Sequence, residues 1–251
     1  MYGKGLEGRF IFLKELMAGR FMGDKSMRGV MGHTAFCTEE YDEKIRQTLP
    51  FYEEFYEQVI DVLDISGKKS ISWLDVGCGT GKMYEAARKR ISIQEFVFTD
   101  ISEKMLAVAK ERFQTGENRF RQMSVLELED TEKYDVVTAI QVHHYLSEKD
   151  RRIAVERCCQ ALKIGGLFFT FENIAPDSEI GRRLVLDRWK SYQIRNGKDK
   201  EEAENHMKRY GVDYFPVTAG AHLELMRECG FQAAELIWMS YMQAGFMGVK
   251  L

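Results

Sequence analysis

The feature that most constrains how this chain folds is an alternation of short apolar runs and helical segments between residues 71 and 173. Runs such as ISWLDV and EFVFTD are typical of buried strands, and SEKMLAVAKERF, which follows the second of them, has the spacing of an amphipathic helix. Strands joined through helices pair in parallel, because each helical crossover returns the chain to the same edge of the sheet. The sequence therefore predicts an α/β fold with a doubly wound, mostly parallel sheet.

The same pattern locates the individual elements. Strands are expected at 71–76, 95–100, 118–124, 134–142 and 165–173, with helices at 83–90, 102–113 and 148–162. Before them, a helix is expected to begin near Pro50, which suits a first helical turn, and to run through Phe51, Phe55, Val59 and Leu63. After them, a helix at 221–230 precedes strands at 231–240 and 244–251, which are close enough to form an antiparallel hairpin at one end of the sheet.

The length of 251 residues allows one or two domains, and the continuous alternation favours one. We expect a domain over 36–251 that carries a polar, helical cap inserted at about 174–217. The segment 1–35 differs, because it is basic and places Leu6, Phe10, Leu13, Met17 and Phe21 on one helical face. We expect this N-terminal extension to be a lid helix, a membrane-surface helix or, as we favour, an extension that is packed on the domain or partly disordered.

The composition indicates in which compartment the protein works and which class of partner it does not bind. Lys and Arg number 36 against 39 Asp and Glu, and this net charge of −3 argues against binding nucleic acid mainly through a bulk positive field. Five cysteines without a CxxC pair favour reduced thiols in the cytoplasm over a disulfide framework or a metal site. No apolar run approaches the ~18 residues of a membrane span. The sequence thus predicts a cytoplasmic globular protein.

A glycine loop follows the first predicted strand, at the carboxyl edge where open α/β sheets bind ligands. Gly77, Gly79 and Gly81 have the spacing G-x-G-x-G, whereas a dinucleotide fold usually shows G-x-G-x-x-G. Asp75, two residues before the first glycine, suits a cationic ligand better than a diphosphate. Asp100 ends the next strand, where a carboxylate can accept hydrogen bonds from both hydroxyls of a ribose. The loop therefore predicts a site for a nucleoside that carries a positive charge.

Four segments in order, LDVGCGTG, VFTD, KYDVVTAIQVHHYL and ALKIGGLFFTFEN, resemble the class I S-adenosylmethionine-dependent methyltransferases. The resemblance runs from about residue 40 to the C-terminus. It implies a Rossmann-like sheet, S-adenosylmethionine as cofactor and S-adenosylhomocysteine as product. It also implies that the glycine loop holds the methionine part of the cofactor.

The resemblance implies roles for further residues at this edge. Asp75 would lie near the cofactor ammonium group, Asp100 on the ribose, and Ile101 against the adenine. Ile140, at the end of the fourth strand, would give a backbone contact, with Gln141 beside it.

One position departs from the family pattern. Where many members have an acidic residue that accepts a hydrogen bond from the adenine amino group, this chain has Ser124, followed by Val125. The contact is therefore expected from the serine hydroxyl, a backbone group or water.

A narrower resemblance covers YDEKIRQTLPFYEEFYEQVIDVL and the C-terminal half from LSEKDRR to GVKL. These segments are similar to the carboxy-S-adenosylmethionine synthases and to related proteins associated with wobble-uridine modification of tRNA. In that group a tyrosine after the proline reaches the cofactor, which implies the same role for Tyr52. Gly79 stands where the synthases have a serine, and their carboxylate-binding arginine matches Arg209 only across a gap. Both departures favour ordinary methyl transfer.

The predicted catalytic residues are His143 and His144, just past the fourth strand and beside the expected position of the methyl group. Methyl transfer from a sulfonium is an in-line displacement, so positioning supplies most of the acceleration and a base is needed only for a protonated acceptor. Strand alternation is expected to send the two imidazoles to different sides. The alternative is that one packs in the interior and the other bonds the backbone.

The cap is the expected place of acceptor specificity. His206, Arg209 and Tyr210 are candidates for contact with an anionic acceptor, and Trp189 and Tyr192 for stacking on a planar one. A solvated cap or a homodimer surface is the alternative. The acceptor itself, a small molecule or a tRNA nucleoside, is not identified by any motif.

The first functional hypothesis is therefore S-adenosylmethionine-dependent methyl transfer. Carboxy-S-adenosylmethionine synthesis and a cofactor-binding module without catalysis are the alternatives, and a nicotinamide oxidoreductase is the weakest interpretation because the dinucleotide spacing is absent.

Overall fold

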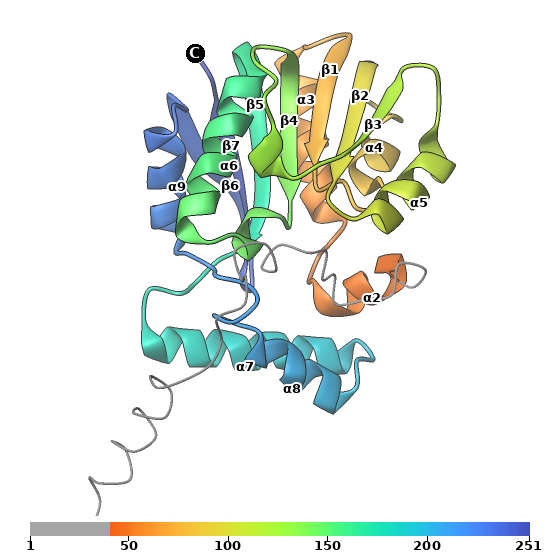
Figure 1. Ribbon diagram of the computed structural model, residues 1–251. Coiled ribbons are helices and arrows are strands. Elements are labelled where there is room, and N and C mark those ends of the chain that lie inside the picture. The colour runs from red at the N-terminus through yellow and green to blue at the C-terminus, as the bar shows by residue number, and fades with distance from the viewer. Residues whose placement is uncertain (1–40) are drawn as a thin grey trace, which may run out of the picture. The chain divides into compact units, whose positions relative to one another are not determined.

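The structure of the protein is a computed structural model that describes residues 41–251 (Figure 1). The N-terminal extension expected at 1–35 lies outside the described residues, so that expectation stays a prediction. Elements carry the labels of Figure 1.

The described residues form a seven-stranded sheet in the order β3-β2-β1-β4-β5-β7-β6. The strands are β1 (Ile71–Val76), β2 (Ile93–Asp100), β3 (Asn118–Gln122), β4 (Tyr134–Ile140), β5 (Leu162–Asn173), β6 (Ala233–Ser240) and β7 (Gln243–Val249). The first five pair in parallel, and β7 pairs antiparallel with both β5 and β6. The predicted doubly wound sheet with its C-terminal hairpin is confirmed.

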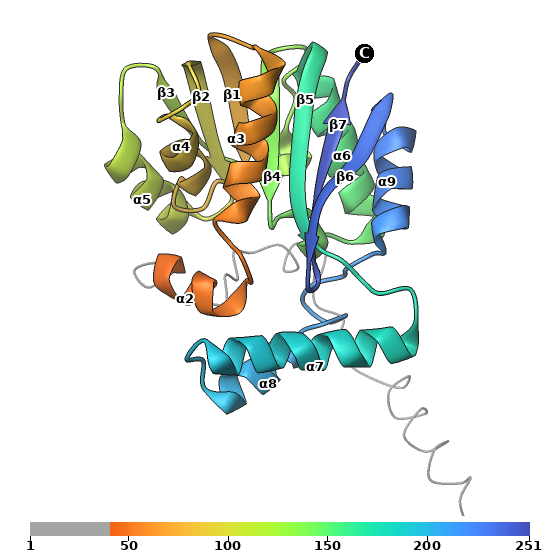
Figure 2. The same ribbon diagram turned by 180° about the vertical axis from the view of Figure 1, so that it is seen from behind.

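Helices cover both faces of this sheet (Figures 1 and 2). They are α2 (Tyr41–Thr48), α3 (Glu54–Ser66), α4 (Lys82–Ala87), α5 (Glu103–Phe113), α6 (Glu148–Ala161), α7 (Glu179–Arg195), α8 (Lys200–Lys208) and α9 (Ala219–Glu228), with 3-10 turns η2 (Val125–Glu127) and η3 (His143–Tyr145). One apolar core joins α3, α4 and α5 to the sheet, and a second joins α6 and α9 to the other face. The order in which strands are added to the sheet reverses between β1 and β4, so the loops after these two parallel strands are neighbours at the carboxyl edge.

The helix predicted through Phe55, Val59 and Leu63 is confirmed as α3, but its predicted start near Pro50 is wrong. Helix α2 ends at Thr48, a turn follows, and α3 begins at Glu54. Phe51, expected on the buried helical face, has φ of 54° and is 57% exposed. A left-handed residue cannot continue a helix, so the chain turns here and Tyr52 is brought inward instead.

Helices α2, α7 and α8 lie beyond the carboxyl edge of the sheet (Figures 1 and 2). The indole Nε1 of Trp189 donates to the Thr48 carbonyl at 2.7 Å, and Lys198 Nζ donates to the Thr48 hydroxyl at 3.0 Å. The C-terminal end of α2 is therefore fastened to the cap (residues 174–217).

Within residues 41–251, none of the helices has both the length and the apolar character that crossing a bilayer requires.

Candidate functional site

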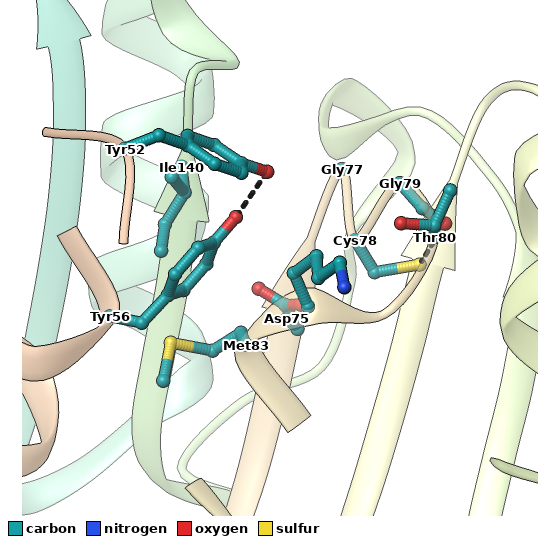
Figure 3. A pocket seen from close by; sticks show the side chains of 10 residues that line it. Tyr52, Tyr56, Asp75, Gly77, Cys78, Gly79, Thr80, Met83 and Ile140 are labelled. Atoms are coloured by element: carbon teal, nitrogen blue, oxygen red, sulfur yellow. Dashed lines mark hydrogen bonds between the residues drawn. The ribbon is translucent and has the colours of Figure 1, made fainter. Parts of the chain in front are cut away.

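A pocket opens where the glycine loop, the end of β4 and the start of α3 meet (Figure 3). Its lining residues are Tyr52, Tyr56, Asp75, Gly77, Cys78, Gly79, Thr80, Lys82, Met83 and Ile140. The lining residues include the glycine loop that the sequence analysis identified. They also include Tyr52 and Ile140, which the sequence analysis placed near the cofactor. The carboxyl edge at the reversal of strand order is where α/β sheets bind ligands.

The three loop glycines all have positive φ, but for two different structural purposes. A β-carbon built on Gly77 would lie 2.5 Å from Val142 Cγ2, and one on Gly81 would lie 2.7 Å from the Phe113 ring. The same atom on Gly79, where φ is 54°, would meet nothing within 4 Å. Gly77 and Gly81 therefore permit close packing, whereas Gly79 leaves backbone open toward the pocket.

Asp75 is a buried carboxylate with little to stabilise its charge. Its Oδ1 accepts a hydrogen bond from Thr138 Oγ1 at 2.6 Å, and the Thr138 oxygen accepts one from Trp73 Nε1 at 2.9 Å, which fixes the hydroxyl direction. Thr138 is its one hydrogen-bond partner among the described residues. Burial and the nearby charge of Asp100 together raise the pKa of Asp75 to about 7, against the opposing effect of the Thr138 bond. A cationic ligand would relieve this imbalance.

Asp100 at the end of β2 holds the glycine loop in place. Its Oδ2 accepts from the Gly79 backbone N–H at 2.9 Å and its Oδ1 from the Ser102 N–H at 2.8 Å. Burial raises its pKa, although both backbone bonds oppose the shift. The next residue, Ile101, is 37% exposed beside it. The carboxylate and an exposed apolar side chain thus lie together after β2, as a ribose and an adenine would require.

Two tyrosines from the turn before α3 and from α3 itself face the glycine loop across the pocket (Figure 3). The Tyr56 hydroxyl donates to the Tyr52 hydroxyl. Burial raises the pKa of Tyr52 above its usual value, so this phenol stays protonated. Because its oxygen already accepts from Tyr56, its own proton is left to donate to a ligand.

Asp42 connects α2 to the glycine loop. It accepts a hydrogen bond from Thr80 Oγ1 and one from Arg112 Nη1, both at 2.6 Å, and Lys82 Nζ lies 3.6 Å away. Burial alone would raise the pKa of Asp42, but these hydrogen bonds and the lysine charge lower it below its usual value. The N-terminal end of α2 is thereby fastened to the loop, as its C-terminal end is to the cap.

The residues expected around the adenine lie in defined turns. Ser124 is the N-cap of η2: its hydroxyl accepts from the Leu126 N–H at 3.2 Å, and its own N–H donates to Glu127. Val125 is buried behind it. The acceptor capacity of Ser124 serves this cap, so its hydroxyl proton is what it can offer a ligand.

Gln141 follows Ile140 with φ of 60°, and both its N–H, at 2.7 Å, and its side-chain Nε2, at 3.1 Å, donate to the Phe171 carbonyl. A non-glycine residue in the left-handed region at the end of a central strand is a strained position held by its surroundings. This turn sends the chain from β4 into η3.

The two predicted catalytic histidines lie in η3, not on a strand, because β4 ends at Ile140. Both rings are buried. The His143 ring packs against Phe168, and neither of its nitrogens has a hydrogen-bond partner among the described residues. Burial lowers the pKa of His143 to about 4. The His144 ring lies instead beside Tyr145 and Tyr214. His143 thus occupies a packing position, whereas His144 faces the cap.

A carboxylate that the sequence reasoning missed lies beneath both histidines. Glu172 of β5 accepts hydrogen bonds from the backbone N–H of His143 at 3.1 Å, from the N–H of His144 at 3.0 Å, from His144 Nδ1 at 2.6 Å and from Thr170 Oγ1 at 2.7 Å. Burial alone would raise the pKa of Glu172, but the His144 bond, the adjacent imidazoles and the Thr170 bond hold it well below its usual value. The sequence signal was an acidic residue within the apolar strand FFTFEN.

The cap places its candidate residues at different depths. Trp189 is fully buried and its indole is 4.9 Å from the His206 ring, which itself contacts Gln193 through Nδ1. Burial lowers the pKa of His206 to about 3. Trp189 therefore packs the cap onto α2 and has no open face on which a planar acceptor could stack. This is a correction to the expected stacking role, and its cause is the bond to Thr48.

Three cap residues, Arg209, Tyr210 and Tyr192, are partly exposed. Arg209 donates through Nε to Asp213 at 2.7 Å, and this is its one side-chain hydrogen bond among the described residues. Tyr210 lies under the Arg182 guanidinium and edge-on to Tyr214. Tyr192 donates to the Arg46 carbonyl at 3.4 Å and packs on Tyr241.

Within residues 41–251, no cluster of three or more His, Cys, Asp or Glu side chains is arranged to hold a metal ion. Cys78, Cys158, Cys159 and Cys229 are buried free thiols.

Comparison with known proteins matches residues 74–168 to the family model described as a methyltransferase domain. Curated relatives include the carboxy-S-adenosyl-L-methionine synthase of Nautilia profundicola, which is 21% identical over 84% of this chain and 90% of its own length. The malonyl-[acyl-carrier protein] O-methyltransferase of Acetivibrio thermocellus is 30% identical over 51% of this chain and 47% of its own.

Solved structures with the same fold include magnesium protoporphyrin IX methyltransferase from Synechocystis PCC 6803 with bound S-adenosylhomocysteine, at a TM-score of 0.58 and 14% identity over 98% of this chain and 95% of that chain. Another is the Haloferax volcanii putative methyltransferase in complex with its Trm112 activator, at a TM-score of 0.59 and 15% identity over 84% and 95%. At these identities the likeness establishes the fold.

Proposed function

Because this chain belongs to the class I S-adenosylmethionine-dependent methyltransferase family, we propose that its glycine-loop pocket binds S-adenosylmethionine and that a small-molecule acceptor is methylated beside it. The enzyme converts the cofactor to S-adenosylhomocysteine. When bound, the cofactor supplies an activated methyl group on a sulfonium. The residues of this chain bind it, orient it and exclude water.

The single observation that carries the proposal is the state of Asp75. A buried carboxylate with one hydroxyl donor, beside the open backbone of Gly79, has no positive partner within residues 41–251. The ammonium group of S-adenosylmethionine provides that charge, and a dinucleotide pyrophosphate would add a second negative one. The donor set therefore fits the sulfonium nucleoside.

The remaining pocket residues take complementary roles. Asp100 receives the ribose hydroxyls while it holds the Gly79 N–H, and Ile101 covers the adenine. Tyr52 donates its hydroxyl proton into the pocket from the opposite wall. Ile140 closes the floor at the end of β4. Ser124, Val125 and Gln141 belong to the same edge and complete the proposed cofactor set.

A small acceptor is favoured over a nucleoside in folded tRNA because the cap is fastened across this edge. The Phe215 N–H donates to the His144 carbonyl at 2.6 Å, and Arg151 donates to the Phe215 carbonyl. These contacts hold the cap segment around Phe215 against η3, and the Trp189 bond holds the cap against α2. Arg209 and Tyr210 are the cap residues proposed to contact the acceptor.

Carboxy-S-adenosylmethionine synthesis is the second candidate, because curated relatives of that name match most of this chain. Arg209, the match for the carboxylate-binding arginine of the synthases, supports this candidate only in part, since its Nε already donates to Asp213. A binding module without catalysis is the third.

The experiment that separates these candidates is mass spectrometry of the ligand that copurifies, followed by incubation of the protein with S-adenosylmethionine and a protein-free cell extract. We expect S-adenosylmethionine or S-adenosylhomocysteine as ligand and time-dependent formation of S-adenosylhomocysteine. A carboxylated cofactor would establish the second candidate, and cofactor binding without turnover the third.

We further propose a cytoplasmic location, from the reduced buried thiols. A homodimer through the outer face of the cap is the proposed assembly, and light scattering at micromolar concentration tests it.

A further inference from the structure

His144 and Glu172 have an arrangement that packing does not explain. The imidazole lies at the carboxyl edge of β4, two residues after Val142, which touches Gly77 of the cofactor loop. Its Nε2 is buried and has no hydrogen-bond partner among the described residues. Buried polar atoms are almost always paired, so an orphaned one in the turn that follows β4 and adjoins the glycine loop calls for a partner that arrives with a ligand.

The tautomer of His144 follows from Glu172. The carboxylate is ionised, since four donors converge on it, and an ionised carboxylate accepts hydrogen bonds but cannot donate. The Asn173 backbone N–H also points at His144 Nδ1, but at 3.5 Å, whereas the Glu172 oxygen lies at 2.6 Å. The shorter contact places the proton of the neutral imidazole on Nδ1. The Nε2 lone pair is then free, at the end of the ring that points away from β5.

The two backbone bonds from η3 to the same carboxylate fix the ring further. Glu172 accepts from the N–H groups of both His143 and His144, so the peptide and the imidazole of residue 144 are anchored to one group. This is the orientation of an imidazole by a buried carboxylate that general-base catalysis uses on unrelated folds. The other buried histidines with an orphaned Nε2 are His143, whose ring packs on Phe168, and His222, whose ring packs on Phe246. Neither of these rings makes a hydrogen bond to a carboxylate among the described residues.

We propose that His144 is the base of the methyl transfer and that Glu172 is its positioning residue, so that the acceptor is a compound with an O–H or N–H nucleophile. This inference rests on the proposed methyl transfer. The acceptor heteroatom forms its bond to the methyl carbon, the carbon–sulfur bond breaks with its electron pair left on sulfur, and the acceptor proton passes to His144 Nε2. A carboxylate acceptor, which carries no proton at neutral pH, would need no such base.

The first test is independent of turnover. NMR of protein labelled at the histidine nitrogens and saturated with S-adenosylhomocysteine reports which nitrogen of His144 carries the proton. We expect a proton on Nδ1 and none on Nε2 at about pH 8. A proton on Nε2 under these conditions overturns the proposal.

The second test uses variants of the full chain. His144→Asn retains an amide donor toward Glu172 and removes Nε2, and His222→Asn is the matched control in the same kind of buried environment. With S-adenosylmethionine and protein-free cell extract as probe, we expect His144→Asn to form S-adenosylhomocysteine ~100-fold or more slowly, and His222→Asn to equal the wild type. Calorimetry with S-adenosylhomocysteine checks that both variants bind the cofactor.

Chemical rescue separates a base from a structural residue. In His144→Ala, added imidazole should restore turnover, because a free base can occupy the space of the missing ring, while a lost packing contact would not be restored. Equal turnover in wild type and His144→Asn overturns the inference and leaves methyl transfer standing. No turnover by any form of the protein contradicts the proposed methyl transfer itself.

Discussion

Asp75 and Glu172 are both buried carboxylates at the carboxyl edge of one sheet, yet their charge states differ. One hydroxyl reaches Asp75, whose pKa burial raises to about 7, whereas four donors reach Glu172, whose pKa lies well below its usual value. The two side chains are buried to a similar depth, with 3% of Asp75 and 2% of Glu172 exposed. The difference between their pKa values therefore comes from the number of hydrogen-bond donors that reach each carboxylate. A carboxylate short of donors is suited to a cationic ligand, and a fully bonded one is suited to hold other groups in place.

The largest expected effect tests the structural side of this comparison. Glu172→Ala leaves four donors without an acceptor and should lower the free energy of unfolding by about 3 to 5 kcal/mol. Asp75→Asn keeps an acceptor for Thr138 and resembles the protonated carboxyl, so near pH 4 it should change this energy by less than about 1 kcal/mol. Urea unfolding measures both, and equal losses would mean that donor number is not what separates the two sites.

The second prediction concerns pH. The folded pKa of Asp75, about 7, lies above its unfolded value near 3.8, so the folded state binds this proton more tightly. The protonated Asp75 side chain therefore contributes its full stability below the unfolded pKa of 3.8. As the pH rises from there to the folded pKa of about 7, about 4 kcal/mol of the free energy of unfolding is lost. The wild-type free energy of unfolding should therefore fall, relative to that of Asp75→Asn, across this window. S-adenosylmethionine should reduce the difference, since its cation pairs with the ionised carboxylate. A constant difference between the two proteins would refute the raised pKa.

The third prediction concerns the cofactor side. Asp100→Ala removes the acceptor for the Gly79 N–H and for the proposed ribose hydroxyls. We expect the affinity for S-adenosylhomocysteine to fall by about 2 to 3 kcal/mol. Isothermal calorimetry measures the loss, with Glu103→Gln on the exposed side of the next helix as control. Unchanged affinity would contradict the ribose assignment.

The fourth prediction compares two glycines of one loop. Gly81→Ala should destabilise the fold by about 2 kcal/mol, because the new methyl group meets the Phe113 ring and φ is positive. Gly79→Ala has the φ cost alone, about 1 kcal/mol, and should act chiefly on cofactor affinity. Thermal unfolding and calorimetry on both variants separate the two effects, and the reverse order of stability would exclude the proposed division of roles.

The smallest expected effect is on α2. Asp42→Asn weakens the attachment of this helix to Thr80 and Arg112 and should speed dissociation of S-adenosylhomocysteine by a few-fold, about 0.5 to 1 kcal/mol. Glu43→Gln, exposed on the same helix, is the matched control. Stopped-flow fluorescence measures the rates, and equal rates would show that α2 does not restrain the cofactor pocket.

Much of the fold followed from the sequence because its signals are local. The central strands are buried on both faces, so their apolar runs stand out, and helices of regular period separate them. The glycine spacing and Asp75 are signals of the same local kind, and they identify the ligand edge of the sheet. The start of α3 was predicted wrongly because a proline near a helix indicates a turn as well as a first helical position, and only the left-handed Phe51 distinguishes them.

The side chains of the cap show where local signals end. Trp189 and Arg209 both suggested acceptor contacts, yet Trp189 is fully buried against α2, where it bonds a carbonyl 141 residues away along the chain. No periodicity encodes a contact at that separation. The same holds for Asp42 and Thr80, which meet only because α2 folds back over the glycine loop.

The sequence by itself determined the class of fold and the position of the glycine loop at the carboxyl edge of the sheet, since each depends on residue type and spacing within a short stretch. Only the tertiary structure decided which carboxylate stays charged and which histidine ring a buried carboxylate holds in place. Those properties depend on the donors that distant strands bring to one point. Glu172 and His144 are 28 residues apart in the chain and 2.6 Å apart in the fold.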